Sequence, residues 1–333
     1  MIKGYAAKGV GQKLENFEYK PEELGLNDIE VAITHCGICH SDLHLIDNDW
    51  QLSQYPLLPG HEIIGTVTAA GAGVGHLQIG QRVGIGWQRS ACLKCEQCLE
   101  GDDNLCPESQ ATCVGHYGGF AQSIRTDSRF AFAIPDGLSS ENAAPLLCAG
   151  ITVYSPLKQF GVKPSMKVGV IGIGGLGHLA LQFARAFGCE VTAFSTSPEK
   201  EAEAKSLGAH YFINSKDPSQ MEQFAGKFNF ILSTVFADLD WTLYMNLLKP
   251  KGNLCFVGAA PKPISIPVFS LIMGQRSVSG SPIGSRSVMN EMLQFAARHK
   301  IMAKTEVLPM AEVNTAIQKV RDNKARYRMV LVN

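Results

Sequence analysis

The chain has 333 residues, with 30 basic and 30 acidic side chains and therefore no formal net charge. A neutral balance gives no global field that would favour nucleic acid or an anionic membrane as a partner. At roughly 100–200 residues per domain, the length predicts two domains. The N-terminus lacks the apolar region of a signal peptide, and no apolar run approaches the ~20 residues of a membrane span. We therefore expect a soluble, cytoplasmic protein with no nucleic-acid or membrane partner.

Residues 1–150 carry short, alternating apolar runs that are separated by Gly and Pro. Four of these runs have the pattern of strands: 29–34, 63–69, 81–85 and 121–124. The sequence predicts a compact, mostly β first domain.

The pattern changes after Pro164, where strand-like runs begin to alternate with helix-period segments. The predicted strands are 168–171, 190–194, 211–213, 229–233, 254–257 and 277–279. Such alternation is typical of an α/β fold with a doubly wound parallel sheet, which we expect over residues 151–284. Two amphipathic helices and a strand at 328–332 follow, and we expect residues 285–333 to complete the first domain.

A glycine-rich turn follows the first of these strands and opens a predicted helix. Its residues match the dinucleotide pattern G-x-G-x-x-G: Gly172, Ile173, Gly174, Gly175, Leu176 and Gly177. The first glycine makes the tight turn, the second admits the pyrophosphate, and the third allows the helix to pack on the strand. The context predicts a Rossmann dinucleotide site rather than a simple glycine-rich turn.

The end of the next strand indicates which nicotinamide cofactor is preferred. NAD sites usually carry an acidic residue there for the ribose 2′-hydroxyl. This chain instead has three hydroxyls and a cation: Ser195, Thr196, Ser197 and Lys200. These groups could hold a 2′-phosphate through charge-assisted hydrogen bonds. The alternative is that Ser197 only caps the next helix and Lys200 is solvated; we favour NADP(H).

Four cysteines lie close together within one short segment: Cys92, Cys95, Cys98 and Cys106. Four thiolates at this spacing suit a closed tetrahedral zinc site, which is structural because no coordination position stays open. An iron–sulfur cluster could use a similar run, but nothing else in the sequence indicates one-electron chemistry.

A second group of metal-ligand types is dispersed along the chain: Cys39, His61, Glu62 and Cys148. Taken singly, each has an ordinary structural explanation. A lone buried cysteine is usually a small hydrophobic residue, and a lone histidine is usually held by hydrogen bonds. Spacing alone cannot join these residues into one site.

Considered together, these segments resemble the zinc-containing medium-chain alcohol dehydrogenases, most closely the cinnamyl-alcohol-dehydrogenase-like aldehyde reductases. The resemblance extends nearly end to end. It rests on residues 39–44, 60–65 with Gly71, the four-cysteine segment, 145–152, 172–177 and 326–328. It implies a GroES-like catalytic domain beside the Rossmann domain, and a hydride transfer between NADP(H) and a primary alcohol or aldehyde.

The resemblance also implies roles for individual residues. Cys39, His61 and Cys148 would hold a catalytic zinc, with Glu62 beside it, giving two zinc ions per chain. Asp42 would orient the histidine ligand, as metal-binding histidines require. Ser41 would exchange a proton with the substrate oxygen, and His44 would relay it to solvent. The cofactor phosphates would meet His40 and Arg328, with Arg326 as the alternative to Arg328.

Two tryptophans, Trp50 and Trp87, match positions that line the substrate cleft in this family, although ordinary core packing would explain them equally well. The segment at 86–90 is more similar to the compact-pocket alcohol dehydrogenases than to the cinnamyl type, which argues against a bulky phenylpropenal substrate. The remaining cysteines are expected to serve packing: Cys36, Cys113, Cys189 and Cys255.

Two other functions are less compatible with these residues. A zinc-free quinone or enoyl reductase of the same superfamily would lack the four cysteines and the Gly60-His61-Glu62 segment. A non-catalytic NADP(H)-binding relative would be expected to lose zinc ligands or the proton relay, and both are intact here. The predicted strand at 277–279 has an edge that family members pair across a two-fold axis, so we expect a homodimer or a dimer of dimers.

Overall fold

The computed structural model describes residues 1–260 and 262–333. They form two compact units, Met1–Ile151 together with Ile283–Asn333, and Thr152–Pro282. Each unit is described separately below.

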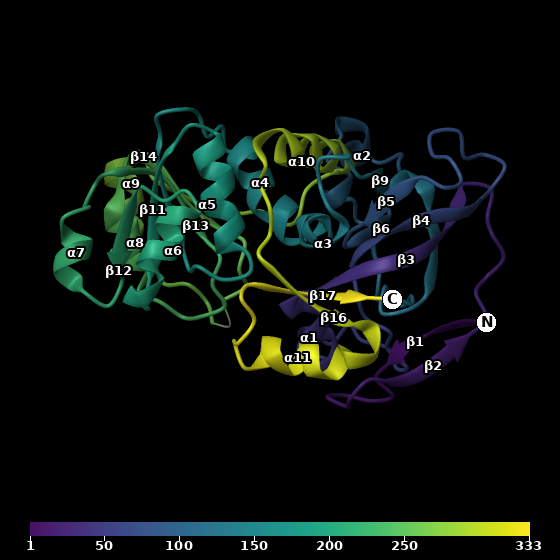
Figure 1. Ribbon diagram of the computed structural model, residues 1–333. Helices are drawn as coiled ribbons and strands as arrows, with labels where there is room; N and C mark the ends of the chain where they lie inside the picture. The colour runs from purple at the N-terminus through teal and green to yellow at the C-terminus, as the bar shows by residue number, and fades with distance from the viewer. Residues whose placement is uncertain (261) are drawn as a thin grey trace. The chain divides into compact units, whose positions relative to one another are not determined.

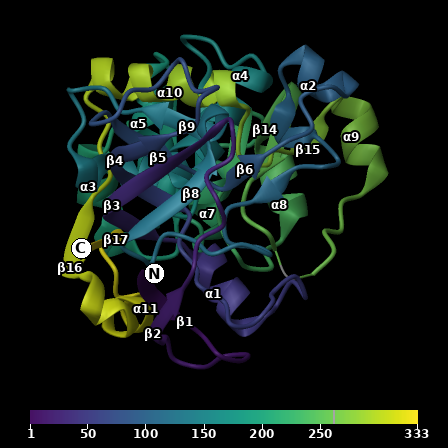
Figure 2. The same ribbon diagram turned by 90° about the vertical axis from the view of Figure 1, so that its right-hand side faces the viewer.

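The first unit is built on a sheet in the order β16-β17-β3-β4-β5-β9, with β8 also pairing with β3 (Figure 2). These strands are β3 (Asp28–Ile38), β4 (Glu62–Ala70), β5 (Arg82–Ile85), β8 (Ser123–Asp127), β9 (Ala131–Ala133), β16 (Thr305–Pro309) and β17 (Arg328–Val332). Two small ribbons accompany the sheet, β1 (Ile2–Ala6) with β2 (Glu15–Tyr19), and β6 (Gln88–Ser90) with β7 (Gln110–Ala111).

The register of three strands positions the site described below. β3 pairs antiparallel with β4, so that Gly37 lies opposite Glu62. β17 pairs antiparallel with the other edge of β3, so that Met329 lies opposite Ile38. The end of β3, the start of β4 and the start of β17 therefore lie side by side.

Short helices cover and connect these strands. They are α1 (His40–Asp47), α2 (Glu96–Glu100), η1 (Asp103–Leu105), η2 (Ser128–Phe130), α3 (Ser140–Ala143), η3 (Ala144–Leu147), α10 (Arg286–His299), η5 (Met310–Glu312) and α11 (Val313–Arg321). α11 buries its apolar stripe against the sheet, with Val313, Ala316, Ile317 and Val320 inside. α4 (Ala149–Gln159) runs from this unit into the second.

The second unit holds a six-stranded parallel sheet in the order β12-β11-β10-β13-β14-β15 (Figure 1). Its strands are β10 (Lys167–Ile171), β11 (Glu190–Ser195), β12 (Tyr211–Asn214), β13 (Phe228–Ser233), β14 (Leu248–Phe256) and β15 (Ser277–Gly280). Its helices are α5 (Gly177–Ala186), η4 (Pro198–Lys200), α6 (Glu201–Ser206), α7 (Pro218–Glu222), α8 (Trp241–Leu247) and α9 (Val268–Gly274). The fully buried central strands have continuous apolar runs, which is typical of parallel sheets.

The predicted fold class is confirmed: a parallel, doubly wound sheet accompanies a mostly β unit. Several elements differ in extent from the prediction. The strand expected at 121–124 lies at Ser123–Asp127, and Ala121 lies outside it in an isolated bridge to Gly4. β14 begins at Leu248, six residues earlier than expected, and its register with β13 shifts between Phe228 and Phe230.

None of the helices within the described residues is long and apolar enough to cross a membrane.

Candidate active site

The four dispersed ligand residues come together at the strand ends described above. Cys39 follows β3, His61 and Glu62 open β4, and Cys148 lies between η3 and α4. One ligand atom from each of these residues lies within 4.8 Å of the others, and all four residues are buried. The sheet register thus places side by side residues that are up to 109 positions apart.

The donor set fits a zinc ion. The Sγ atoms of Cys39 and Cys148 are 3.9 Å apart, close to the roughly 3.8 Å expected for two tetrahedral ligands at Zn–S distances of about 2.3 Å. Nε2 of His61 and Oε2 of Glu62 are buried and have no hydrogen-bond partner among the described residues. A buried imidazole nitrogen without a partner is costly unless a metal or another group occupies its lone pair.

Each thiol changes the acidity of the other. The contact with Cys148 lowers the pKa of Cys39 well below its ordinary value, and the contact with Cys39 raises that of Cys148. Either sulfur can donate to the other, which stabilises a thiolate in this pair. A cation would favour thiolates at both positions, because the thiolate is the form that binds metal.

Asp42 organises this cluster from the first turn of α1. Its carboxylate accepts hydrogen bonds from the Cys39 N–H at 2.9 Å, from the Gly60 N–H at 2.9 Å and from Nδ1 of His61 at 3.0 Å. The side chain is fully buried. The Asp42 contact fixes the tautomer in which His61 Nε2 carries a free lone pair.

A buried ion pair borders the same cluster. Nη2 of Arg328 donates a hydrogen bond to Oε1 of Glu62, and the arginine is only 3% exposed. Burial raises the pKa of Glu62 to about 7, although Arg328 acts in the opposite direction. The sequence alone gives no sign of this pairing, and the assignment of Arg328 to the cofactor phosphates stays a prediction.

Helix α1 carries the two residues expected to move protons. Ser41 and His44 are three positions apart and so share one face of the helix. The Sγ of Cys39 donates to the Ser41 hydroxyl at 3.6 Å, and Nδ1 of His44 lies 2.7 Å from Oδ2 of Asp49. His40, the first residue of the helix, is exposed.

The two tryptophans lie against these histidines. The ring of Trp87 meets that of His61 edge-on, with centroids 4.9 Å apart. Trp50 lies 5.1 Å from the His44 ring and 6.2 Å from the Trp87 ring. Both indoles are partly buried, and Trp87 is the one that contacts a ligand residue.

The four clustered cysteines form a separate group around α2. The sulfurs of Cys92, Cys95, Cys98 and Cys106 all lie within 4.8 Å of one another. The Cys92 N–H donates to the sulfur of Cys106 at 3.4 Å, and the Cys95 N–H donates to the sulfur of Cys92 at 3.3 Å. A hydrogen bond from the Lys94 N–H contributes most to lowering the pKa of Cys92 to about 7. This set of four thiols with no oxygen or nitrogen ligand suits a closed zinc site.

In the second unit, the glycine turn joins β10 to α5. Gly172 has a φ of +85°, and a Cβ on Gly177 would lie 1.8 Å from the Gly172 carbonyl oxygen. A Cβ on Gly174, in contrast, would meet nothing within 4 Å among the described atoms. Gly174 therefore borders open space at the N-terminus of α5, where the backbone N–H groups of Gly175, Leu176 and Gly177 favour an anion.

The hydroxyl-rich segment follows β11. Ser195 is 8% exposed, and its Oγ accepts a hydrogen bond from the Ser197 N–H at 3.2 Å. Thr196 is exposed, and Ser197 stands at the N-cap position without a side-chain cap hydrogen bond. Nζ of Lys200 donates to the Ile173 carbonyl at 2.9 Å, which ties this segment to the glycine turn.

Three supporting residues were not predicted. Cys113, expected to serve packing alone, lies with Asp42 and His61 in one buried group. Asp49 holds His44, and Thr234 donates to the carbonyls of Ile171 and Gly172 at 2.9 and 3.0 Å. The sequence gives no spacing signal for Cys113 or Thr234, because tertiary contacts alone bring them to their partners.

Comparisons with known proteins match both units. Residues 25–136 match the family model "Alcohol dehydrogenase GroES-like domain", and residues 175–298 match "Zinc-binding dehydrogenase". An aldehyde reductase from Synechocystis is 48% identical over 331 residues, which cover 99% of this chain and 98% of the relative. The chain belongs to the zinc-containing alcohol dehydrogenase family. It is an oxidoreductase that acts on CH–OH groups.

Solved members of this family share the whole architecture. A cinnamyl alcohol dehydrogenase from Sorghum bicolor superposes with a TM-score of 0.95 at 39% identity, covering 99% of this chain and 97% of that one. The Helicobacter pylori enzyme, solved with NADP(H), gives a TM-score of 0.91 at 34% identity, with the same two coverages. The alcohol/aldehyde activity and the zinc-containing family expected from the sequence are thus confirmed.

Proposed function

We propose that this dehydrogenase interconverts primary alcohols and aldehydes at the cluster of Cys39, His61 and Cys148, with NADP(H) as its cofactor. The observation that carries the site assignment is the buried, unpartnered Nε2 of His61 beside two thiols in contact. Ser41 is within reach of the same thiol, so a proton donor and the metal ligands share one site.

Each residue of this cluster would have a distinct role in the reaction. A bound zinc ion supplies Lewis acidity toward the substrate oxygen, and a bound nicotinamide supplies or accepts the hydride. Asp42 keeps His61 in the tautomer that leaves Nε2 free. Glu62, neutralised in part by Arg328, adds an oxygen donor with a free Oε2 beside the three ligands.

Protons would travel along α1. In aldehyde reduction, the Ser41 hydroxyl gives its proton to the substrate oxygen and is resupplied through His44 on the same helix face. Asp49 orients the His44 ring through Nδ1, so that the imidazole can complete the relay. Trp50 and Trp87 would bound the substrate and keep its reactive end by His61, and their bulk favours compact substrates.

The cofactor preference rests on the residues after β11. Ser195, Thr196, Ser197 and Lys200 offer hydroxyls and a cation where NAD enzymes carry an acid. The related H. pylori enzyme was solved with NADP(H). The pyrophosphate would lie on Gly174, Gly175, Leu176 and Gly177. The roles of His40 and Arg328 toward the cofactor phosphates stay predictions from the family resemblance.

We also propose two zinc ions per chain, a cytoplasmic location and a symmetric homo-oligomer. Reduced zinc thiolates persist in a reducing compartment. The edge strand β15 and the apolar face of α9 support self-association, as argued in the Discussion.

An aldehyde-reduction panel with NADPH and NADH tests this proposal, with zinc measured per chain. We expect turnover of small aldehydes, a preference for NADPH and two zinc ions. A Cys39→Ser variant should stay folded and lose one zinc together with turnover. Near-wild-type activity of that variant would overturn the assignment, whereas equal use of both cofactors would overturn only the NADP(H) preference.

A further inference from the structure

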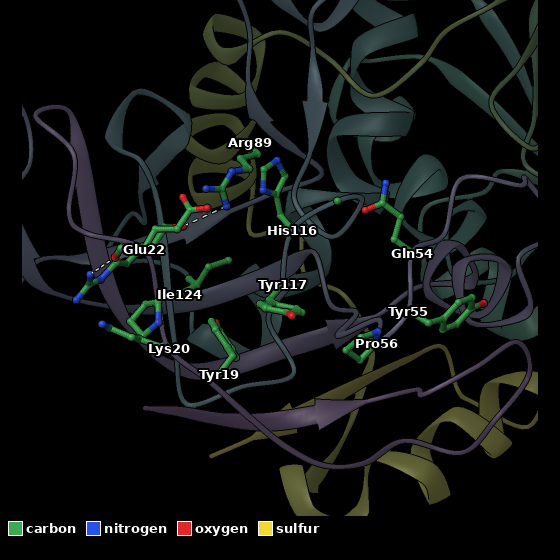
Figure 3. A pocket seen from close by; sticks show the side chains of 13 residues that line it. Tyr19, Lys20, Glu22, Gln54, Tyr55, Pro56, Arg89, His116, Tyr117 and Ile124 are labelled. Carbon is green, nitrogen blue, oxygen red and sulfur yellow. Dashed lines mark hydrogen bonds between the residues drawn. The ribbon is translucent and has the colours of Figure 1, made fainter.

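The first unit carries a cavity whose lining residues differ from those of the site above. It has a volume of about 310 Å³, at the lower end of the roughly 300–1,000 Å³ typical of small-molecule sites. Its walls come from the segments after β2 and α1, from β6, and from β8 with the segment before it (Figure 3). None of its lining residues is a zinc ligand, a relay residue or one of the two tryptophans near His61.

One wall of the cavity is aromatic. The rings of Tyr19 and Tyr117 lie 4.3 Å apart, and Phe17 supports Tyr117 edge-on from behind at 5.3 Å. Both tyrosines are only partly buried and face the cavity in Figure 3. Burial contributes most to raising the pKa of Tyr19 to about 12, so its hydroxyl is a hydrogen-bond donor at neutral pH. A planar ring could stack on this pair.

The opposite wall is cationic. Arg89 donates to the Arg125 carbonyl at 3.2 Å but has no carboxylate within 4.0 Å among the residues described. Burial lowers the pKa of Arg89 more than the nearby acids, Asp28, Glu22 and Asp127, raise it. A partly desolvated guanidinium without an ion-pair partner is a good binding group for a carboxylate.

The other charged groups at the cavity leave it biased toward anions. Arg125 lines the cavity but is neutralised by Glu30, with Nε and Oε2 2.6 Å apart. Lys20 adds a second cation, and Glu22 is the only carboxylate among the lining residues. The net charge of the lining residues is positive, and Glu22 is the lining carboxylate that opposes an anion. Asp28 and Asp127 also act on Arg89, from outside the lining.

We propose that this cavity binds a small aromatic carboxylate, with its carboxylate on Arg89 and its ring against Tyr19 and Tyr117. Free phosphate would use the cationic wall alone, and a neutral aromatic compound would use the tyrosine wall alone. An aromatic carboxylate uses both walls at once.

Calorimetric titration of the full-length zinc-loaded protein with 4-hydroxybenzoate tests the proposal. 4-Hydroxybenzamide, which has the same ring without the charge, and inorganic phosphate should each bind at least about tenfold more weakly. Arg89→Gln should weaken 4-hydroxybenzoate binding about tenfold or more, as expected for losing a charged hydrogen bond. Arg298→Gln, which removes an equal charge from an exposed position outside the cavity, should leave it unchanged.

Glu22→Gln provides an independent check, because it should tighten binding of the carboxylate and leave binding of the amide unchanged. Tyr117→Leu should weaken both aromatic ligands. Equal affinity of the wild type and Arg89→Gln for 4-hydroxybenzoate would place the ligand elsewhere, for example on the zinc, and would overturn the proposal. So would a Glu22→Gln variant with weaker or unchanged carboxylate binding. Neither result depends on turnover, so the assignment of the active site is tested separately.

Discussion

Some side chains of the candidate site can be recognised from the sequence, and others cannot. Gly-His-Glu at 60–62 and the cysteine at 39 are visible as family motifs, and the structure brings them together with Cys148. The Glu62–Arg328 pair is not visible, because it depends on β17 pairing with β3 in one register, with Met329 opposite Ile38. A shift of one residue would turn Arg328 to the other face of the sheet.

Asp42 is the residue on which the ligand geometry depends most. We expect Asp42→Asn to weaken zinc binding at the Cys39 cluster by about 10- to 100-fold, the range for outer partners of metal-binding histidines. The amide can donate to His61 Nδ1 and so favour the wrong tautomer. Zinc retained per chain after dialysis against a graded chelator measures the effect.

Asp47→Asn is the matched control, since Asp47 ends the same helix in an exposed ion pair with Arg321. It should retain zinc as the wild type does. Equal zinc retention by Asp42→Asn would show that Asp42 serves only to cap α1.

Ser195 is the position at which one substitution should remove most of the preference for NADP(H). Each hydrogen bond to a charged group contributes ~1.5–3 kcal/mol. Two or three such bonds to the 2′-phosphate, discounted for solvent exposure, should favour NADP(H) by roughly 2–4 kcal/mol. This corresponds to a ~30- to 1000-fold higher kcat/KM with NADPH than with NADH. Ser195→Asp should erase most of that preference, because its carboxylate repels the 2′-phosphate and offers NADH a ribose partner. The ratio of kcat/KM for NADPH and NADH is the measurement.

Ser206→Asp adds the same charge at the end of α6 and should leave the ratio unchanged. A Ser195→Asp enzyme that still prefers NADPH strongly would mean that this segment does not face the adenosine ribose. Lys200 is a poorer test position, since it also holds the Ile173 carbonyl and its loss would disturb the turn for both cofactors.

Among the elements, the parallel sheet was the most predictable part. Each central strand is a short apolar run bounded by glycine or by a helix start, and the glycine turn marks where the first strand ends. The short ribbons β1–β2 and β6–β7 and the edge strand β16 were not predicted. Their half-exposed residues give weak alternation, and tertiary pairing rather than local pattern defines them.

The four-cysteine segment is an element with little apolar content, so its fold should depend on metal. None of the residues of α2 is buried. We expect Cys95→Ser to lower the midpoint of thermal unfolding and to lose one zinc per chain, because structural zinc contributes folding free energy directly. Scanning calorimetry with zinc analysis tests this, and Cys189→Ser, which changes a buried cysteine of the second unit, is the control. An unchanged unfolding midpoint would contradict a structural role.

Asp103 connects this segment to the rest of the first unit. Asp103 is 2% exposed, and its carboxylate oxygens lie 3.4 Å from the backbone N–H and from Nε of Arg286. Its backbone carbonyl accepts a hydrogen bond from the side-chain amide of Gln88, the residue after Trp87. Asp103→Asn should therefore lower the free energy of unfolding by ~1–3 kcal/mol, the cost of disrupting a buried hydrogen-bonded charge, while both zinc ions stay bound. Urea unfolding measures this; Asp102→Asn, one residue earlier and exposed, should have little effect.

At the scale of the whole molecule, the second unit carries a surface suited to self-association. The parallel sheet ends at β15, whose outer edge is partly exposed, and α9 directly precedes β15 in the chain (Figure 2). Helix α9 exposes four large apolar side chains at helical spacing, each at least 65% exposed: Val268, Phe269, Ile272 and Met273. An apolar face beside an unpaired edge strand is typical of a self-association surface.

We therefore expect Ile272→Glu to shift the protein from a dimer, or a dimer of dimers, toward smaller species. A two-fold interface uses the same patch twice, so each substitution buries two carboxylates and the destabilisation is doubled. Light scattering after size-exclusion chromatography at micromolar concentration measures the mass. Met302→Glu, at a 48% exposed position of the first unit, should leave it unchanged. A wild-type protein that is already monomeric under these conditions would contradict the interface, and α9 would then be an apolar surface without a partner copy.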